Sequence, residues 1–314
     1  MITRVSTQSV YNKTIAEFGK RQASIADLNR QITSGREAGD FVQMGSKIRR
    51  VQDLETKITR TDGYNTNIDT ATIRLNTMNQ SLEDIEQVAK DLLSNITTRR
   101  SAAGSEMPLA QLAKGQLQQI KEALNRSAQG RYLFAGARTD QPPVGDIDTQ
   151  TNLLTPNGTP ATGVSVTTAN VSANYYSGDA TVFDVRASDD LTVTYGVTAD
   201  NDAFKQLIGA LNTAIEGQNS NDDTLFKKAF DDATGALNKL ITIKSDVNNN
   251  LLILDDTKNV HDKFSTYLNQ VLSDSEGVDV PSATIKLSLD QTVLQATFQS
   301  FAGISGLRLL DFLK

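Results

Sequence analysis

The placement of proline constrains the fold of this chain more than any other feature. All six prolines fall at positions 108, 142, 143, 156, 160 and 281, so residues 1–107 and 161–280 contain none. A proline inside a helix removes a backbone hydrogen bond and clashes with the preceding turn. Two long stretches are therefore free to form long helices, and the proline cluster at 142–160 separates them.

Residues 64–96 show the most regular hydrophobic pattern in the chain. Apolar or aromatic residues recur at alternating steps of four and three, which is typical of a helix that packs along one seam. The recurring residues are Tyr64, Ile68, Ala71, Leu75, Met78, Leu82, Ile85, Ala89, Leu92 and Ile96. We expect one long helix that begins near Ile48, with this stripe in the core of an intramolecular bundle.

Three further helices are predicted around this one. A shorter helix begins after Pro108 and carries Leu109, Leu117 and Leu124, and a helical pattern returns at 204–215. A second long ladder then repeats every seven residues. Its members are Phe226, Ala233, Leu240, Val247, Leu254, His261 and Leu268, with Lys244 and Lys258 interrupting the apolar stripe.

Both ends of the chain carry heptad stripes of their own. The first consists of Tyr11, Phe18, Ile25 and Ile32, and the second of Leu287, Leu294 and Phe301, with Phe298 and Leu309 nearby. Between Leu287 and Leu307 the only charged residue is Asp290. A helix with so little charge is expected to be buried on several sides, which one partner helix cannot achieve. We interpret these nine residues as a subunit interface, and an ordinary internal coiled coil is the alternative.

Residues 138–200 differ from the rest of the chain. Helical periodicity stops, and residues 164–166, 182–185 and 191–195 alternate at period two, as strands do. We expect a small β-rich insert here. Because the ends of an insert on a helical scaffold lie close together, it is expected to tolerate deletion.

The predicted fold class is mainly α with a β-rich insert. We expect an elongated rod in which the N- and C-terminal helices pair as a coiled coil at one end, the long helices form an antiparallel bundle, and the β-rich part lies at the other end. The predicted domains are 1–45 plus 280–314, 46–137 plus 201–279, and 138–200.

Composition argues against most enzyme classes. The chain has no cysteine and only one histidine, His261, which excludes thiol chemistry, zinc–thiolate sites and multi-histidine metal sites. No nucleophile elbow or phosphate loop is present. We therefore assign no catalytic, metal or cofactor residue and predict no enzyme.

A net charge of −6 argues against a nucleic-acid partner. No uninterrupted apolar run long enough to cross a membrane occurs, and the C-terminal segment lacks the basic face of a membrane-surface helix.

Three segments carry a resemblance to the flagellin family. Thr33-Ser34-Gly35-Arg36 follows the N-terminal stripe, and the chain ends with Leu294–Phe298 and Leu309–Leu313. The segment Gly130-Arg131-Tyr132-Leu133-Phe134-Ala135-Gly136 resembles a motif of the hook–filament junction members of that family. The resemblance covers about residues 1–137 and 200–314. It departs from the family at Glu37–Met44, so the joint there is expected to differ in detail.

This resemblance implies a non-enzymatic structural subunit of the bacterial flagellum. Such a protein is secreted through the type III apparatus and forms a ring of identical subunits at the distal end of the hook. The implied partners are a FlgK-type hook-associated protein, flagellin and a FlgN-type export chaperone. The alternative within the family is a flagellin-type filament subunit, which the junction motif and the short insert disfavour.

The residues of the motif also have an interpretation that needs no family. Gly130 and Gly136 give the backbone freedom to turn, and Tyr132 and Phe134 are large enough to anchor the turn that closes the preceding helix. A direct contact at the junction is the alternative role for this segment.

Overall fold

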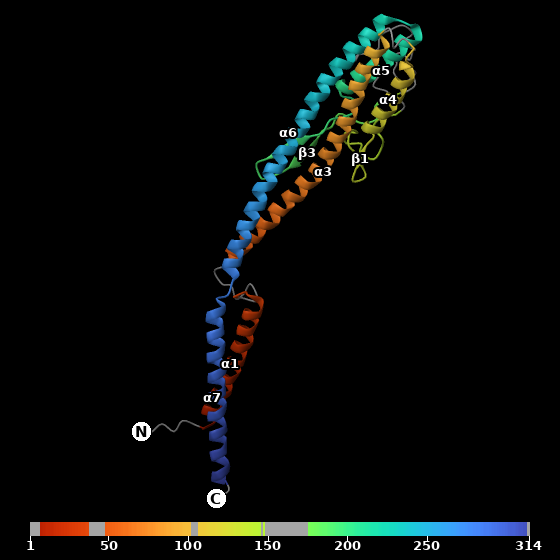
Figure 1. Cartoon of the computed structure of the whole chain (residues 1–314). Coiled ribbons are helices and arrows are strands. Elements are labelled where there is room, and N and C mark those ends of the chain that lie inside the picture. Colours follow the sequence, from red (N-terminus) through yellow and green to blue (C-terminus); the bar gives the residue numbers. More distant parts are fainter. Residues whose placement is uncertain (1–6, 38–47, 102–105, 146, 148–174, 313–314) are drawn as a thin grey trace. The chain divides into compact units, whose positions relative to one another are not determined.

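The computed structural model describes residues 7–37, 48–101, 106–145, 147 and 175–312, with the backbone alone for 7–11 and 303–312. The prediction of a mainly α fold with a small β part is confirmed (Figure 1). The elements are α1 (Thr7–Ser34), α3 (Ile48–Arg99), α4 (Leu109–Leu124), β1 (Ser127–Ala128), β2 (Arg131–Tyr132), β3 (Phe183–Arg186), β4 (Thr192–Tyr195), α5 (Asp202–Ser220), α6 (Asp223–Glu276) and α7 (Val280–Phe312). The strand predicted at 164–166 lies outside the described residues.

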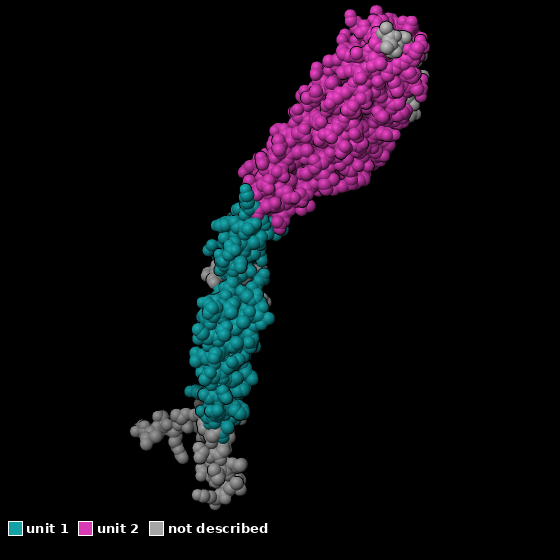
Figure 2. Space-filling view, viewed as in Figure 1, with its two compact units in different colours: residues 1–60, 263–314 teal, residues 61–262 magenta. Residues whose placement is uncertain are grey.

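The chain divides into two compact units, which are coloured separately in Figure 2. The first unit contains residues 1–60 and 263–314, and the second contains residues 61–262. In the part of the chain that the structure describes, no helix is long and apolar enough to cross a lipid bilayer.

In the first unit, α1 and α7 lie side by side and run in opposite directions (Figure 1). Leu28 on α1 and Ala283 on α7 are buried. Gly35 ends α1 with a φ of 71°, a value that glycine adopts without a steric penalty. Its carbonyl accepts a hydrogen bond from the backbone N–H of Val278 at 3.1 Å. The two chain segments next to the helix pair are therefore fastened to each other.

The second unit is built on the two long helices. Nine of the ten residues in the 64–96 ladder are buried and the tenth, Tyr64, is half-buried, so the predicted intramolecular core is confirmed. From α6, Phe226, Ala233, Leu240, Val247 and Leu254 are buried as well. Lys244 interrupts the α6 stripe, but its ammonium pairs with Glu83 at 3.3 Å and Glu86 at 3.1 Å on α3.

The described part of 138–200 has no core of its own. β3 and β4 form an antiparallel hairpin with Val185 opposite Val193 and Phe183 opposite Tyr195. Val144, Tyr175, Val193 and other buried residues of this segment belong to the same hydrophobic cluster as Leu75 and Phe204 of the helices. Because these side chains complete the core of the helical bundle, the structure argues against the expected tolerance to deletion, which stays a prediction.

Candidate assembly surfaces

The first candidate surface is an apolar hollow formed by the helix pair of the first unit. It has a volume of about 300 Å³ and is lined by Thr14, Ile15, Phe18, Thr297, Phe298 and Phe301. Two of its residues are unusually exposed for their size, since Phe298 is 62% and Ile15 is 51% accessible to solvent. Three aromatic rings predicted from the heptad stripes thus gather at one place on the pair.

The other residues of the predicted interface lie along the same two helices. Ile25 and Ile32 on α1 and Leu287 and Leu294 on α7 are half-buried, as are Phe18 and Phe301. They do not reach the full burial of the ladder in the second unit. The side chains of Tyr11 and Leu309 lie outside the described residues. The assignment of these nine residues to contacts between subunits stays a prediction.

A second exposed apolar strip on α7 escaped the sequence analysis. Ile285 is 70% and Leu289 is 60% accessible, and the two residues are four apart, which places them on one face of the helix. At 3.6 residues per turn, this face points largely away from the one that carries buried Ala283 and Asp290. The helical repeat of Ile285 and Leu289 was the available signal, and the stronger heptad of Leu287 and Leu294 obscured it.

The seam between α1 and α7 contains a polar cluster around the buried residue Asp290. The carboxylate of Asp290 accepts hydrogen bonds from the hydroxyl of Ser24 at 2.6 Å and from the guanidinium of Arg21, with which it also forms an ion pair. The Ser24 hydroxyl, and then Arg21, hold the pKa of Asp290 below its ordinary value although burial opposes the shift. Burying a charged carboxylate costs free energy unless hydrogen-bond and ion-pair partners compensate for the lost water. Arg21 and Ser24 can do so in one alignment of the two helices only, so the cluster fixes their register.

The first half of the motif at 130–136 forms a tight hairpin. Ser127 pairs with Tyr132 and Ala128 with Arg131, and the two residues between the strands, Gln129 and Gly130, have φ values of 53° and 73°. Positive φ at both central positions is the geometry of a type I′ turn, which suits the twist of a two-residue hairpin. The predicted turn after the short helix is therefore present.

The second half of the motif is enclosed by the rest of the unit. Phe134 is fully buried and meets Phe204 of α5 edge to face, with ring centroids 6.0 Å apart. Its backbone carbonyl accepts a hydrogen bond from the N–H of Ala199 at 2.9 Å. The predicted anchoring role of Phe134 agrees with this position, whereas Tyr132 is half-buried and Arg131 is exposed.

Gly136 lies against Asp179 so closely that no side chain fits between them. A Cβ atom at Gly136 would lie 2.3 Å from Oδ1 and 2.4 Å from the backbone oxygen of Asp179. The Asp179 carboxylate accepts hydrogen bonds from the backbone N–H groups of Ala137 and Thr181, both at 2.9 Å. These two donors lower the pKa of Asp179. The motif therefore ties the segment 138–200 to the chain that follows α4.

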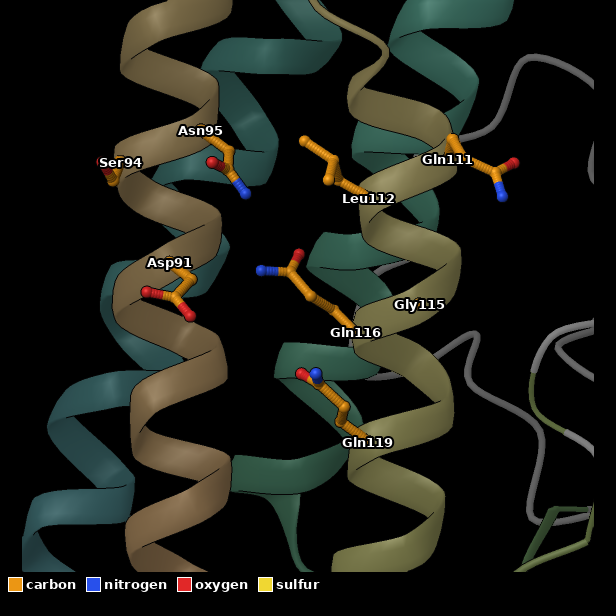
Figure 3. A pocket seen from close by; sticks show the side chains of 8 residues that line it. All are labelled: Asp91, Ser94, Asn95, Gln111, Leu112, Gly115, Gln116 and Gln119. Atoms are coloured by element: carbon orange, nitrogen blue, oxygen red, sulfur yellow. The ribbon is translucent and has the colours of Figure 1, made fainter.

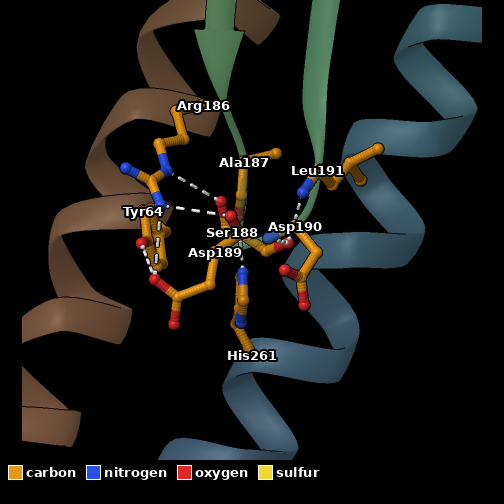
Figure 4. Close-up of polar contacts among 8 residues, drawn as sticks. All are labelled: Tyr64, Arg186, Ala187, Ser188, Asp189, Asp190, Leu191 and His261. Atoms are coloured by element: carbon orange, nitrogen blue, oxygen red, sulfur yellow. Dashed lines mark hydrogen bonds and ion pairs between the residues drawn. The ribbon is translucent and has the colours of Figure 1, made fainter.

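His261 has a structural environment rather than a catalytic one (Figure 4). Its Nε2 atom lies 2.7 Å from the carbonyl oxygen of Ala187, at the tip of the β3–β4 hairpin. The ring stacks on Tyr64 with centroids 5.8 Å apart, and the Tyr64 hydroxyl donates to the carboxylate of Asp189 at 2.7 Å. The histidine and the tyrosine together hold the hairpin tip on α3 and α6.

Comparisons with known proteins agree with this architecture. The model of the bacterial flagellin N-terminal helical region matches residues 5–139. A curated relative, flagellar hook-associated protein 3 of Escherichia coli strain K12, is 21% identical over 326 residues, which cover 99% of this chain and all of that protein.

Solved structures show the same fold. A putative flagellar hook-associated protein from Vibrio parahaemolyticus aligns with a TM-score of 0.55 and 13% identity, over 72% of this chain and 96% of that one. FlgL of Bacillus cereus aligns with a TM-score of 0.50 and 12% identity, over 66% of this chain and 98% of that one. The resemblance inferred from the three sequence segments is confirmed, and the relatives found are structural proteins rather than enzymes.

Proposed function

We propose that this chain, which is similar to flagellin and to flagellar hook-associated proteins, assembles through its terminal helices into the ring that joins the hook to the filament. The observation that carries this proposal is the apolar hollow with Phe18, Phe298 and Phe301. Large aromatic side chains that lie exposed in a hollow are the usual anchors of protein–protein interfaces.

The two apolar faces of α7 support contacts with more than one neighbour. One face carries Phe298 beside α1, and the other carries Ile285 and Leu289. A single added helix covers one face only, since helix pairs contact each other along one stripe. In a closed ring, each subunit has a neighbour on both sides, and a heterologous interface of this kind uses two different patches.

The proposed position at the junction rests on the motif and on the likeness to hook-associated proteins. Hook-associated protein 3 and FlgL are the names of the relatives with which this chain aligns along most of its length. The position proposed from this likeness is the distal end of the hook, outside the cell, after type III export. The proposed neighbours there are a FlgK-type protein and flagellin, and a FlgN-type chaperone is the proposed partner of the apolar C-terminal helix before export.

Phe298→Asp tests the interface. The side chain is 62% exposed, so the monomer should fold normally, whereas a carboxylate in a closed subunit contact would be desolvated without a partner. We expect normal secretion and circular dichroism, but no stable incorporation into hook–basal bodies and at least a tenfold loss of swimming cells. Gln22→Asp adds the same charge to an exposed site on α1 outside the hollow and should behave as wild type. Full incorporation of Phe298→Asp would refute the assignment.

A filament subunit of the same family is the second candidate, because its terminal helices would show the same exposed apolar faces. The two roles differ in copy number. A trace band in sheared and washed flagella, with immunogold label at the end of the hook, supports the junction role. A dominant band along the whole filament would establish the filament subunit instead.

A further inference from the structure

A polar hollow separates α3 from α4 in the second unit (Figure 3). Its volume is about 390 Å³, within the range of about 300–1,000 Å³ that is usual for ligand pockets. It is lined by Asp91, Ser94, Asn95, Gln111, Leu112, Gly115, Gln116 and Gln119. Apart from Leu112 and Gly115, all the lining residues carry amide, hydroxyl or carboxylate groups. Neither the predicted interface nor the family motif includes any of them.

Gln116 is the unusual residue of this hollow. Its side chain extends from α4 towards α3 (Figure 3) and is only 7% exposed, yet its Oε1 atom has no hydrogen-bond donor. Buried amide oxygens in folded proteins almost always accept a hydrogen bond, because leaving them unpaired costs free energy. The oxygen therefore favours a ligand that brings an N–H or O–H group into the hollow.

The opposite wall provides a negative charge. Asp91 lines the hollow from α3, and Asn95 extends from the same helix towards α4 (Figure 3). Asp91 accepts one hydrogen bond, from Gln87 on its own helix at 2.8 Å. Among the described residues, no lysine or arginine lines the hollow. The site thus offers a carboxylate and an unpaired amide oxygen on two different helices, with no cation of its own to neutralise them.

We propose that this hollow binds an arginine side chain presented by a partner protein. A guanidinium has five N–H donors in a planar fork, so it can reach acceptors on both walls at once, which a lysine ammonium cannot do with the same geometry. The methylene groups of the arginine would lie against Leu112, which is 40% exposed at the edge of the hollow. This binding does not depend on the assembly of the terminal helices.

The probe for this site is the peptide acetyl-Gly-Arg-Gly-amide, titrated into the isotope-labelled full-length chain and followed by NMR. We expect saturable shifts at the side-chain amide signals of Gln116 and Asn95, with an affinity in the millimolar range. The same peptide with citrulline, which is neutral and nearly isosteric, should produce shifts at least fivefold smaller. Equal shifts with citrulline, or none at Gln116 with the arginine peptide, would overturn the proposal.

Two substitutions locate the binding on the protein. Asp91→Asn should weaken the arginine peptide at least fivefold, because it removes the charge of the α3 wall. Glu122→Gln removes one negative charge from an exposed position of α4 outside the hollow and should leave the affinity unchanged. Equal weakening by both substitutions would show general charge attraction and contradict a specific site. The peptide comparison on the unsubstituted chain remains decisive if either variant folds poorly.

Discussion

Asp290 shows how one residue can align two helices that are far apart in the sequence. It is the only charge in the central part of α7, and it lies in the seam with Arg21 and Ser24 of α1. Sliding either helix by one turn would separate the carboxylate from both partners and leave it buried without compensation. Apolar side chains in the same seam could slide with less penalty, so the polar cluster supplies the specificity of this pair.

Replacing Asp290 with Asn should loosen the pair of α1 and α7. The pKa of Asp290 is lowered in the folded protein, chiefly by the Ser24 hydroxyl, so the folded state favours the charged carboxylate. Its stabilising effect is therefore complete above the ordinary carboxyl pKa of about 4 and is lost as the pH falls through the lower folded value. The protection factors of amides 280–302, which are exchange rates corrected for their intrinsic pH dependence, should fall in Asp290→Asn at neutral pH and in wild type only on acidification; mass spectrometry measures them.

The matched control for this experiment is Asp274→Asn. Asp274 is exposed near the end of α6 and accepts a hydrogen bond from Gln270 on the same helix. The Asp274→Asn substitution should leave the amide exchange of α7 unchanged at neutral pH. If both variants behaved alike, the cluster around Asp290 would not determine the stability of the pair.

Gly136 gives a second prediction for a single residue. Its φ is 66°, and an added Cβ would meet the carboxylate and backbone of Asp179. Gly136→Ala should therefore lower the free energy of unfolding of the second unit by about 1–3 kcal/mol. Gly63→Ala, at a helical position with open space around it, should raise that free energy by about 0.5–1 kcal/mol. Urea titrations followed by circular dichroism measure the free energy of unfolding of both variants. An unchanged value for Gly136→Ala would show that the loop adapts to the added methyl group.

At the scale of elements, the sequence predicted what depends on local periodicity and missed what depends on distant partners. The 64–96 ladder placed α3 correctly because a ten-member repeat on one face can be buried in only one way. The β1–β2 hairpin was predicted only as a turn, since strands of two residues carry no periodicity. The buried position of Asp290 was missed because a lone charge is usually solvated, and its partners are 269 and 266 residues away.

The segment 138–200 was expected to be an insert that can be deleted, and the structure gives the opposite prediction. Val144, Tyr175, Val185, Val193 and Tyr195 are all buried in the core shared with the helices. Each large apolar side chain contributes about 1.5–3 kcal/mol on burial, and a whole domain is stable by only about 5–15 kcal/mol.

A chain in which Gly-Ser residues replace 138–200 should therefore not keep a folded second unit. Thermal melts by circular dichroism would show the loss of its cooperative transition. As a control, the single variant Val182→Ser changes a side chain that is 46% exposed and should melt like wild type. A deletion variant with normal cooperativity would contradict the shared core.

At the scale of the whole molecule, buried apolar side chains are distributed unequally. All members of the main hydrophobic cluster fall between Ile68 and Leu254, in the second unit. The apolar side chains described as buried in the first unit are Leu28, Val51, Leu54, Leu268 and Ala283. Apolar burial is the main source of folding free energy, so the first unit should be the less stable of the two.

The last prediction follows from this inequality. Scanning calorimetry of the purified chain should give two transitions, with the first unit melting at the lower temperature. Asp290→Asn should lower only the first midpoint and Gly136→Ala only the second, because each residue lies inside one unit.

If the exposed faces of α1 and α7 associate between copies, the first midpoint should also rise with protein concentration, since association stabilises the folded form by mass action. The variant Phe298→Asp should abolish this concentration dependence while leaving the midpoint of the dilute protein unchanged. A single transition that both Asp290→Asn and Gly136→Ala shift equally would mean that the two units unfold together, and the terminal helices would then need no neighbour to be stable.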